Sequence, residues 1–561
     1  MKWLKDLGLA WSFVLVCQNS LGDTVITAEA QAFIDAHLQR VRPLELEANI
    51  AWWEANTTGK PEAFERKEKA QNKIDAALAD KKIFERLKAI RANGSQIDEP
   101  LVRRTIDVLY LQYLGSQVDP DLLKKMASLA NQVEKDFNGF RANINGQEIT
   151  ENQIREILRN STDSTRRKQV WESGKRVGEL VIPNLQELVR LRNQAAKALG
   201  FASFHALQLH LNEQNGPDLL KLFDELDELT RAPFLALKRE MDSELAKRCG
   251  IQTAELRPWH YHDPFFQESP GVFAADLDQP FRKADLLKLC SEFYQGIDLP
   301  IDRVLTRSDL YEKSGKSPHA FCTDIDRIGD VRVLANIVPN EYWASTMLHE
   351  LGHAVYSSLN IPESMPYILR SEAHILTTEG IAMQFERLSR KSKFLITMGI
   401  EVVEPKTFES GAGKALRARL LIFSRWCQVM LRFEKSMYEN PDQDLNKLWW
   451  DLVEKYQGLT RPEGRNQPDF ASKIHIVSAP VYYHNYMMGE LFASQVHHAL
   501  CRKLYPGEDP RQVVYAKDKR VGAFLKEQIF SKGKSLPWNE LVESATGEKL
   551  NAKAFARDFQ P

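Results

Sequence analysis

Residues 348–354 of this 561-residue chain read LHELGHA, and this stretch decides both the fold class and the chemistry. His349 and His353 are four residues apart, so an α-helix presents both imidazoles on one face, one turn apart. Two imidazoles at this spacing can bind one Zn²⁺ at about 2.0–2.1 Å. Glu350 would stand beside the metal, where it can take a proton from zinc-bound water. The motif therefore predicts a buried helix that carries a zinc site.

A catalytic zinc site needs a third protein ligand and one open position. The longer HExxHxxGxxH pattern is absent, because Tyr356 and Leu359 occupy its Gly and third His positions. Residues 377–385 read TTEGIAMQF, which predicts a second buried helix with one acid at its start. Glu379 is therefore the predicted third ligand, with Glu372 and Glu386 as alternatives. Glu386 precedes an arginine and has the pattern of a solvent-exposed helix end. The alternative interpretation of residues 348–354 is an ordinary helix whose two histidines are bonded to other side chains and bind no metal.

A second group of polar residues lies near the C-terminus, within residues 468–501. Peptide hydrolysis forms an oxyanion, and Tyr and His can donate hydrogen bonds to it without adding a full charge. Tyr483 and Tyr486 are three residues apart, which makes them neighbours on a helix face. On spacing alone, an aromatic stripe packed in the core is the simpler interpretation. The polar residues of the group are Lys473, His475, Tyr482, Tyr483, His484 and Tyr486.

Helical patterns dominate the rest of the chain. Alternating β patterns are scarce, and the best of them covers residues 332–338. There is no fixed-period repeat and no flexible linker, so we predict one mainly α-helical catalytic domain over residues 23–561, made of two halves around a cleft. The helical stretches are residues 28–56, 62–92, 99–138, 150–160, 165–199 and 218–247.

The charge balance excludes several classes of protein. Lys and Arg number 75 and Asp and Glu number 76, whereas a nucleic-acid scaffold or a polybasic membrane-surface protein usually has a basic surplus. Six cysteines in a chain of this length do not form a disulfide scaffold. We expect mostly buried free thiols.

The N-terminus has the pattern of a secretory signal peptide. Lys2 and Lys5 precede an apolar run over residues 7–16, and small residues stand at positions 20 and 22. The run is too short to span a bilayer comfortably, and no later segment offers about 18 uncharged apolar residues. We therefore predict removal of residues 1–22, no integral membrane span afterwards, and a secreted or periplasmic protein. A lipoprotein cut before Cys17 fits poorly, because the preceding residue is a bulky valine.

Together these residues resemble the angiotensin-converting enzyme family of zinc peptidyl-dipeptidases. Motif order and approximate spacing agree over nearly the whole chain after residue 22, including residues 47–53, 171–173 and 456–458. The zinc motif alone is widely shared, but its combination with residues 473–475 and with Tyr483-x-x-Tyr486 is far more specific. The resemblance implies a large ellipsoidal gluzincin fold of helices with few short strands, split by a deep central substrate channel.

The resemblance also implies a role for each site residue. One Zn²⁺ per chain would be held by His349, His353 and Glu379, with Glu350 as general base and later proton donor. His475 and Tyr486 would stabilise the oxyanion. Lys473 and Tyr483 would bind the free C-terminal carboxylate of the substrate. His319 and Ala320 would form hydrogen bonds with the substrate backbone from an edge segment.

The chain departs from the family at several positions. Met383 stands where the family usually has an Asp that supports a zinc-binding His, so the residues behind the zinc ligands must differ. Asn485 replaces an Arg tied to chloride activation, which makes chloride dependence doubtful. His475 and Tyr483 are one residue further apart than in the animal enzymes. A Gln that helps to bind the terminal carboxylate is expected near residues 259–262. The sparse cysteines suit a bacterial member.

The sequence thus predicts a zinc peptidase that removes dipeptides from the C-termini of short peptides. Within enzymes, the alternatives are a carboxypeptidase that removes one residue and an endo-acting oligopeptidase. From another class, the alternative is a peptide-binding protein that has lost catalysis. All three zinc ligands and the base are present, which argues against that alternative.

Overall fold

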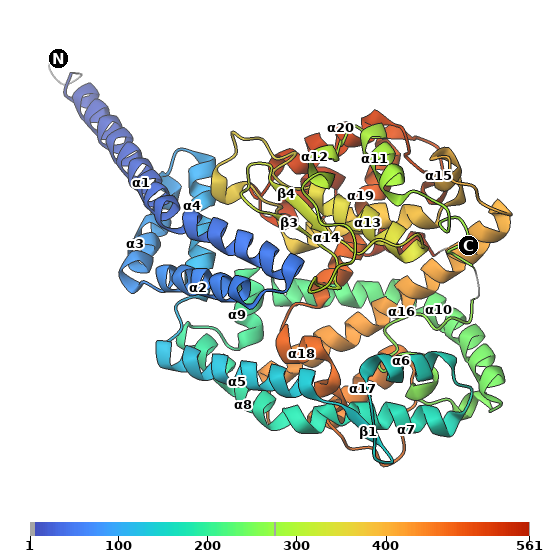
Figure 1. Ribbon diagram of the computed structural model, residues 1–561. Coiled ribbons are helices and arrows are strands. Elements are labelled where there is room, and N and C mark those ends of the chain that lie inside the picture. Colours follow the sequence, from blue (N-terminus) through green and yellow to red (C-terminus); the bar gives the residue numbers. More distant parts are fainter. Residues whose placement is uncertain (1–5, 274–275, 560–561) are drawn as a thin grey trace.

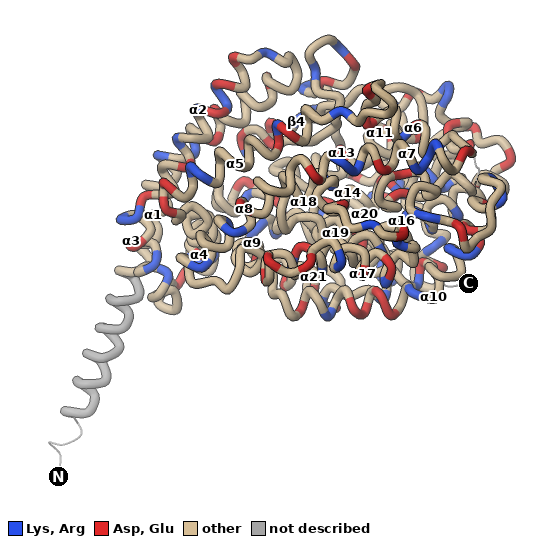
Figure 2. Tube along the Cα trace, turned by 90° about the horizontal axis from the view of Figure 1, so that it is seen from below, with Lys and Arg blue, Asp and Glu red and all other residues tan. Residues whose placement is uncertain are grey.

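The computed structural model describes residues 6–273 and 276–559, with side chains described from residue 25 onward (Figure 1). This part of the chain is mainly helical and contains two small antiparallel sheets, so the predicted fold class is confirmed. The signal peptide predicted over residues 1–22 lies outside the residues whose side chains are described. Basic and acidic residues are interspersed along the described chain in Figure 2, in agreement with the balanced composition. None of the helices in this part of the chain offers an apolar stretch long enough to cross a membrane.

Twenty-two α-helices and four strands are assigned within the described residues, and their bounds follow in chain order. The helices are α1 (Asp6–Thr58), α2 (Pro61–Leu78), α3 (Lys81–Ala92), α4 (Pro100–Gly115), α5 (Pro120–Gly139), α6 (Glu151–Asn160), α7 (Ser164–Lys175), α8 (Val177–Ala198), α9 (Phe204–Leu211), α10 (Gly216–Cys249), α11 (Leu286–Gly296), α12 (Asp302–Leu305), α13 (Glu341–Val355), α14 (Ile375–Glu386), α15 (Ser392–Thr397), α16 (Pro405–Glu439), α17 (Leu445–Gln457), α18 (Ile474–Ser478), α19 (His484–Leu504), α20 (Lys519–Gln528), α21 (Trp538–Thr546) and α22 (Lys553–Arg557). The strands are β1 (Ala142–Ile144), β2 (Gln147–Ile149), β3 (Phe321–Asp324) and β4 (Val331–Leu334).

Local signals account for most helix boundaries. The stretch predicted over residues 99–138 is divided into α4 and α5, because Asp119 accepts hydrogen bonds from two backbone N–H groups and Pro120 begins the new helix. At the start of α6, Thr150 and Gln153 form a capping box, in which each side chain accepts a backbone N–H of the other residue.

Sequence periodicity predicted the strands less well than the helices. The predicted strand over residues 332–338 is the shorter β4, which pairs antiparallel with β3, and Phe321 lies opposite Leu334. Neither β3 nor the β1–β2 hairpin was predicted, because segments of three or four residues are too short to show an alternation. β3 matters for function, since it lies beside the zinc-motif helix.

Three helices cross where their side chains are small. A Cβ atom on Gly352 of α13 would lie 2.8 Å from the Cα of Ala382 in α14. On the same helix α14, a Cβ on Gly380 would lie 2.9 Å from the carbonyl oxygen of Gly489 in α19. Contacts of this kind let the helix backbones approach more closely than larger side chains permit. Helix α14 is thereby in direct contact with the zinc-motif helix and with α19.

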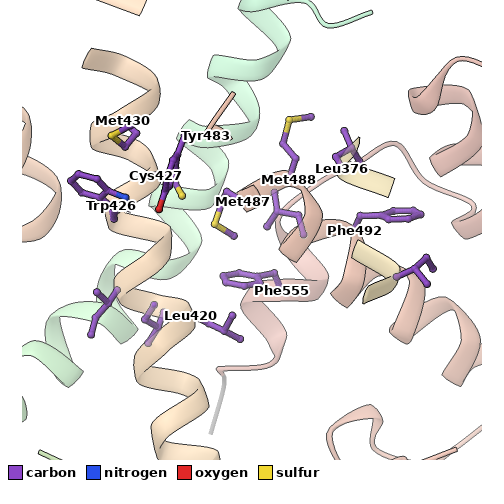
Figure 3. Close-up of a cluster of buried hydrophobic side chains, with 14 of the residues drawn as sticks. Leu376, Leu420, Trp426, Cys427, Met430, Tyr483, Met487, Met488, Phe492 and Phe555 are labelled. Carbon is purple, nitrogen blue, oxygen red and sulfur yellow. The ribbon is translucent and has the colours of Figure 1, made fainter. Parts of the chain in front are cut away.

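A large apolar core supports this crossing. Figure 3 shows its section between α16 and α19, where Trp426 and Cys427 of α16 lie close to Tyr483, and Met487 and Phe492 follow along α19. The rings of Trp426 and Tyr483 meet edge to face, with centroids 6.1 Å apart. Tyr483 precedes α19, so this packing fixes the N-terminal end of the helix.

Candidate metal centre and peptide-binding cavity

Three predicted ligands converge in one place. His349 and His353 come from α13 and Glu379 from α14, and one ligand atom from each lies within 4.8 Å of the other two. The two Nε2 atoms are 3.1 Å apart, and Nε2 of His349 is 3.5 Å from Oε2 of Glu379. Ligands bound tetrahedrally at 2.0–2.1 Å are about 3.3 Å from one another. The set therefore fits a zinc ion.

The histidine rings are also oriented for a metal. Nδ1 of His349 donates to Oε2 of Glu386 at 2.7 Å, and Nδ1 of His353 is 2.8 Å from the hydroxyl of Thr378. Both Nδ1 atoms are thus engaged, which leaves the two Nε2 atoms facing each other. Two imidazole nitrogens at this distance need a proton or a cation between them, since their lone pairs otherwise repel.

The charges around the histidines favour a cation. Glu350, Glu379 and Glu386 all interact with His349. Burial opposes a charge on His349, but the hydrogen bond to Glu386 and these carboxylates outweigh it and raise the pKa of His349 to about 9. Burial raises the pKa of Glu379 to about 7, and it raises the pKa of Glu350 as well. A divalent cation would balance this excess of buried carboxylate.

Glu386 is where the sequence interpretation was wrong. It is the last residue of α14, yet its side chain is only 13% exposed, and it is neither a solvent-exposed helix end nor a member of the converging ligand set. Its second carboxylate oxygen accepts a hydrogen bond from Arg419 of α16 at 2.7 Å. Burial opposes ionisation of Glu386, but Arg419 and His349 outweigh it and hold the pKa of this carboxyl well below its usual range. The sequence could not reveal this, because Arg419 is 33 residues away.

The predicted base lies next to the edge strand. Glu350 is buried in α13, and its carboxylate accepts the backbone N–H of Cys322 in β3. Ala320 and His319 directly precede β3, so at about 3.3 Å per residue they lie about 7 and 10 Å along the chain from Cys322. The structure places this segment beside the base, with His319 exposed and Ala320 half-buried.

The other four predicted residues share one cavity of about 730 Å³. It is lined by Lys473, His475, Tyr483 and Tyr486, together with Met383, which lies one turn after Glu379. Tyr486 interacts electrostatically with Glu379. The cavity therefore extends from the region of the metal ligands to Lys473, and the aromatic residues are not a stripe confined to the core.

Gln267 lines the cavity, whereas the sequence interpretation expected a Gln near residues 259–262. Nζ of Lys473 donates to Oε1 of Gln267 at 2.5 Å, and both residues line the cavity. The expected position, residues 259–262, is buried instead, and Trp259 packs there against Trp171 with ring centroids 5.9 Å apart. The surrounding loop has no periodicity that could fix an alignment. A usable signal was Asp263, whose carboxylate accepts the backbone N–H of Gln267 and shapes the turn.

The cavity residues have protonation states suited to binding an anion and donating hydrogen bonds. Burial lowers the pKa of Lys473 to about 8, so the ammonium form predominates at neutral pH. Burial and the nearby Lys473 lower the pKa of His475 to about 4, and its Nδ1 lacks a hydrogen-bond partner within the described residues. Burial, and to a lesser extent Glu379, raises the pKa of Tyr486, so this phenol keeps its proton.

Backbone strain occurs between His475 and Tyr483, where the family resemblance implies one extra residue. Val481 has a φ of +56°, which is unfavourable for a β-branched residue. Its N–H donates to Oε1 of the buried Glu434 at 2.9 Å, which stabilises the turn. Asn485 is buried nearby, where it accepts a hydrogen bond from Gln214 and donates one to the carbonyl oxygen of Tyr482.

Comparison with known proteins finds a matching family and similar proteins. The family described as angiotensin-converting enzyme matches residues 25–231 and 277–561. An angiotensin-converting enzyme-like protein, Ace3, from Mus musculus is 24% identical over an alignment that covers 100% of this chain and 78% of that protein. Angiotensin-converting enzyme from Mesocricetus auratus is 25% identical over 70% of this chain, and the enzyme from Theromyzon tessulatum is 23% identical over 54%.

The matches differ in how much of each relative they cover. The alignments span 32% of the Mesocricetus auratus enzyme and 51% of the Theromyzon tessulatum enzyme. These relatives are animal proteins, and nothing in the comparisons supports the bacterial source that the sparse cysteines suggest. All five cysteines after residue 22 are free thiols, as expected.

Proposed function

The chain belongs to the angiotensin-converting enzyme family of metallopeptidases, and we propose that it releases dipeptides from the free C-termini of short peptides. One observation carries this proposal: the buried Lys473 ammonium, held by Gln267, lines the same cavity as His475 and Tyr486. A peptide whose carboxylate binds Lys473 would extend from there toward the metal ligands.

In this proposal a zinc ion bound by His349, His353 and Glu379 would act as a Lewis acid that acidifies water and polarises a peptide carbonyl. Glu350 takes a proton from the attacking water and later delivers it to the leaving amine. Because burial raises the pKa of Glu350, its carboxylate is a stronger base than an exposed one.

The cavity residues position the substrate. Tyr486 and neutral His475 donate hydrogen bonds to the developing oxyanion. Lys473, Gln267 and Tyr483 hold the terminal carboxylate, and this contact fixes which peptide bond is attacked. Backbone groups around Ala320 would pair with the extended substrate next to β3.

The first test is mass spectrometry of products from a free-acid nonapeptide and its C-terminal amide, each digested by the zinc-loaded protein. Successive loss of two residues from the free acid, with little cleavage of the amide, is the expected result. Loss of single residues would mean that the carboxylate site lies closer to the metal than proposed. Internal cleavage of both peptides would support an oligopeptidase, and no cleavage by the zinc-bound protein would support a peptide-binding protein.

We also propose that the protein is secreted after cleavage behind residue 22. N-terminal sequencing of the protein recovered from its own host tests this, because the mature chain should begin at Asp23. An intact Met1 on the active protein would contradict the proposal.

A further inference from the structure

We propose that Glu386 and Arg419 are positioning residues, in which Glu386 fixes the ring and tautomer of His349 and Arg419 holds Glu386 in place. The inference rests on the proposed zinc centre and extends it to residues that do not touch the metal. Glu386 connects two donors, Nδ1 of His349 and Nη2 of Arg419, through its two carboxylate oxygens at 2.7 Å each.

At position 386, only a carboxylate can accept hydrogen bonds from both His349 and Arg419. The imidazole Nδ1–H and the guanidinium N–H both donate, so Glu386 must accept on both sides. A glutamine could accept from one of them, but its amide would then direct an N–H group at the other donor. The arrangement thus requires the acid specifically, and a polar residue of the same size does not replace it.

No other residue of α14 in the described structure supports His349. Met383, one turn earlier, has a thioether whose sulfur would lie 3.3 Å from a Cβ on Gly489, and it lines the cavity. Glu379 is a member of the ligand set. The carboxylate that orients the first histidine therefore comes from the end of α14, two turns after the ligand.

The two histidines are supported differently. His349 donates to a carboxylate, whereas His353 pairs with the neutral hydroxyl of Thr378. An imidazole that is hydrogen-bonded to a carboxylate is a more basic metal ligand than one that is hydrogen-bonded to a hydroxyl. We therefore expect the loss of Glu386 to weaken zinc binding more than the loss of the Thr378 hydroxyl.

Arg419 extends this support to a third helix. It lies on α16, lines the substrate cavity, and its Nη2 is also 3.7 Å from the carboxylate of Glu490 on α19. Glu490 lies one turn after Tyr486, and Arg387 at the end of α14 also binds it. One guanidinium thus links the residue behind His349 to the helix that carries the proposed oxyanion donor.

The test measures the zinc dissociation constant by competition with a chelator, together with the visible spectrum of the Co²⁺-loaded protein. Glu386→Gln should weaken zinc binding about 10–100-fold and shift the cobalt bands, and Thr378→Val should weaken it less. In the double variant Glu386→Gln/Arg419→Gln, the guanidinium no longer competes for the introduced amide oxygen, which can then accept from Nδ1 of His349, so part of the affinity should return. The matched control is Glu213→Gln, which removes a carboxylate from the buried Arg104 pair without touching the ligands.

Zinc affinity and cobalt bands of Glu386→Gln within threefold of the wild type would overturn the inference. Absence of tight zinc binding by the wild type would instead overturn the proposed zinc centre, so the two failures are distinguishable. Thermal unfolding of the metal-free variants checks their fold. If Glu386→Gln does not fold, Arg419→Gln takes its place, with weaker zinc binding expected and unchanged binding overturning the inference.

Discussion

Replacement of Lys473 by Met tests the proposed carboxylate site most directly. Met keeps an unbranched apolar stem and removes the ammonium group, whose Nζ lies 5.4 Å from the ring centroids of Phe265 and Trp426. A hydrogen bond to a charged group contributes about 1.5–3 kcal/mol, which corresponds to about a 10–150-fold loss in kcat/KM for a free-acid peptide. Because Lys473 is only 6% exposed, we expect a loss near the upper end of this range.

The same variant should hardly affect a C-terminally amidated peptide. The amide has no charge to pair with Lys473, so its slow hydrolysis should change less than about fivefold. Lys238→Met is a suitable control, because Lys238 is also buried, at 7% exposure, but it binds Asp242 and Tyr261 away from the cavity. Equal losses on the acid and the amide would show that Lys473 supports the fold of the cavity and does not recognise the carboxylate.

Four further measurements follow from the structure. Glu350→Gln should still bind zinc stoichiometrically but lose at least about 10³-fold in kcat, and full activity of the metal-loaded variant would remove Glu350 from the mechanism. The KM for free-acid peptides should rise as the pH passes about 8, where Lys473 loses its proton, and the rise should disappear in Lys473→Arg; a flat profile in the wild type would contradict this. Lys175 is 4% exposed, and burial lowers its pKa from 10.5 to about 7, so the native state loses protons before the unfolded state and stability rises with pH across this window. Lys175→Met should therefore unfold at a higher temperature at pH 6.5, with a gain in unfolding free energy of up to about 5 kcal/mol that shrinks toward pH 10; a less stable variant at pH 6.5 would refute the reasoning. Turnover should be equal in chloride and acetate buffers, because Asn485 is neutral and both its side-chain polar atoms are hydrogen-bonded to other residues of the protein. Strong chloride activation would contradict this.

The predicted site residues that the structure brings together are those whose geometry is local. His349 and His353 are joined by one helical turn, and Tyr483 and Tyr486 lie three residues apart at the start of α19, so the spacing alone places each pair on one face. Glu379 was found because it is the one acid near the start of a strongly apolar helix. In each case the chain positions the side chain through a single helix.

The residues that sequence reasoning missed depend on contacts between distant segments. Gln267 reaches Lys473 across 206 residues, from a loop whose length and course no periodicity predicts. Glu386 was predicted to be exposed, because a charged residue that lies at a helix end beside another charged residue is usually exposed to solvent. Its burial depends on Arg419, which a different helix supplies. Long-range pairing of this kind has no signature in a single sequence.

The helix crossings explain why the site can form from helices at all. A metal site needs its ligands placed to within a few tenths of an ångström, which loops rarely provide without support. Here Gly352 lets α13 approach α14 beside His353, and Gly380 and Gly489 let α14 approach α19 beside Glu379 and one turn from Tyr486. Helix backbones in contact have little freedom to slide, so the proposed zinc ligands and the proposed oxyanion donor are fixed relative to one another before substrate arrives. The hydrogen bonds of Glu386 and Arg419 then need only to set the orientation of a ring whose Cα position the crossings already determine.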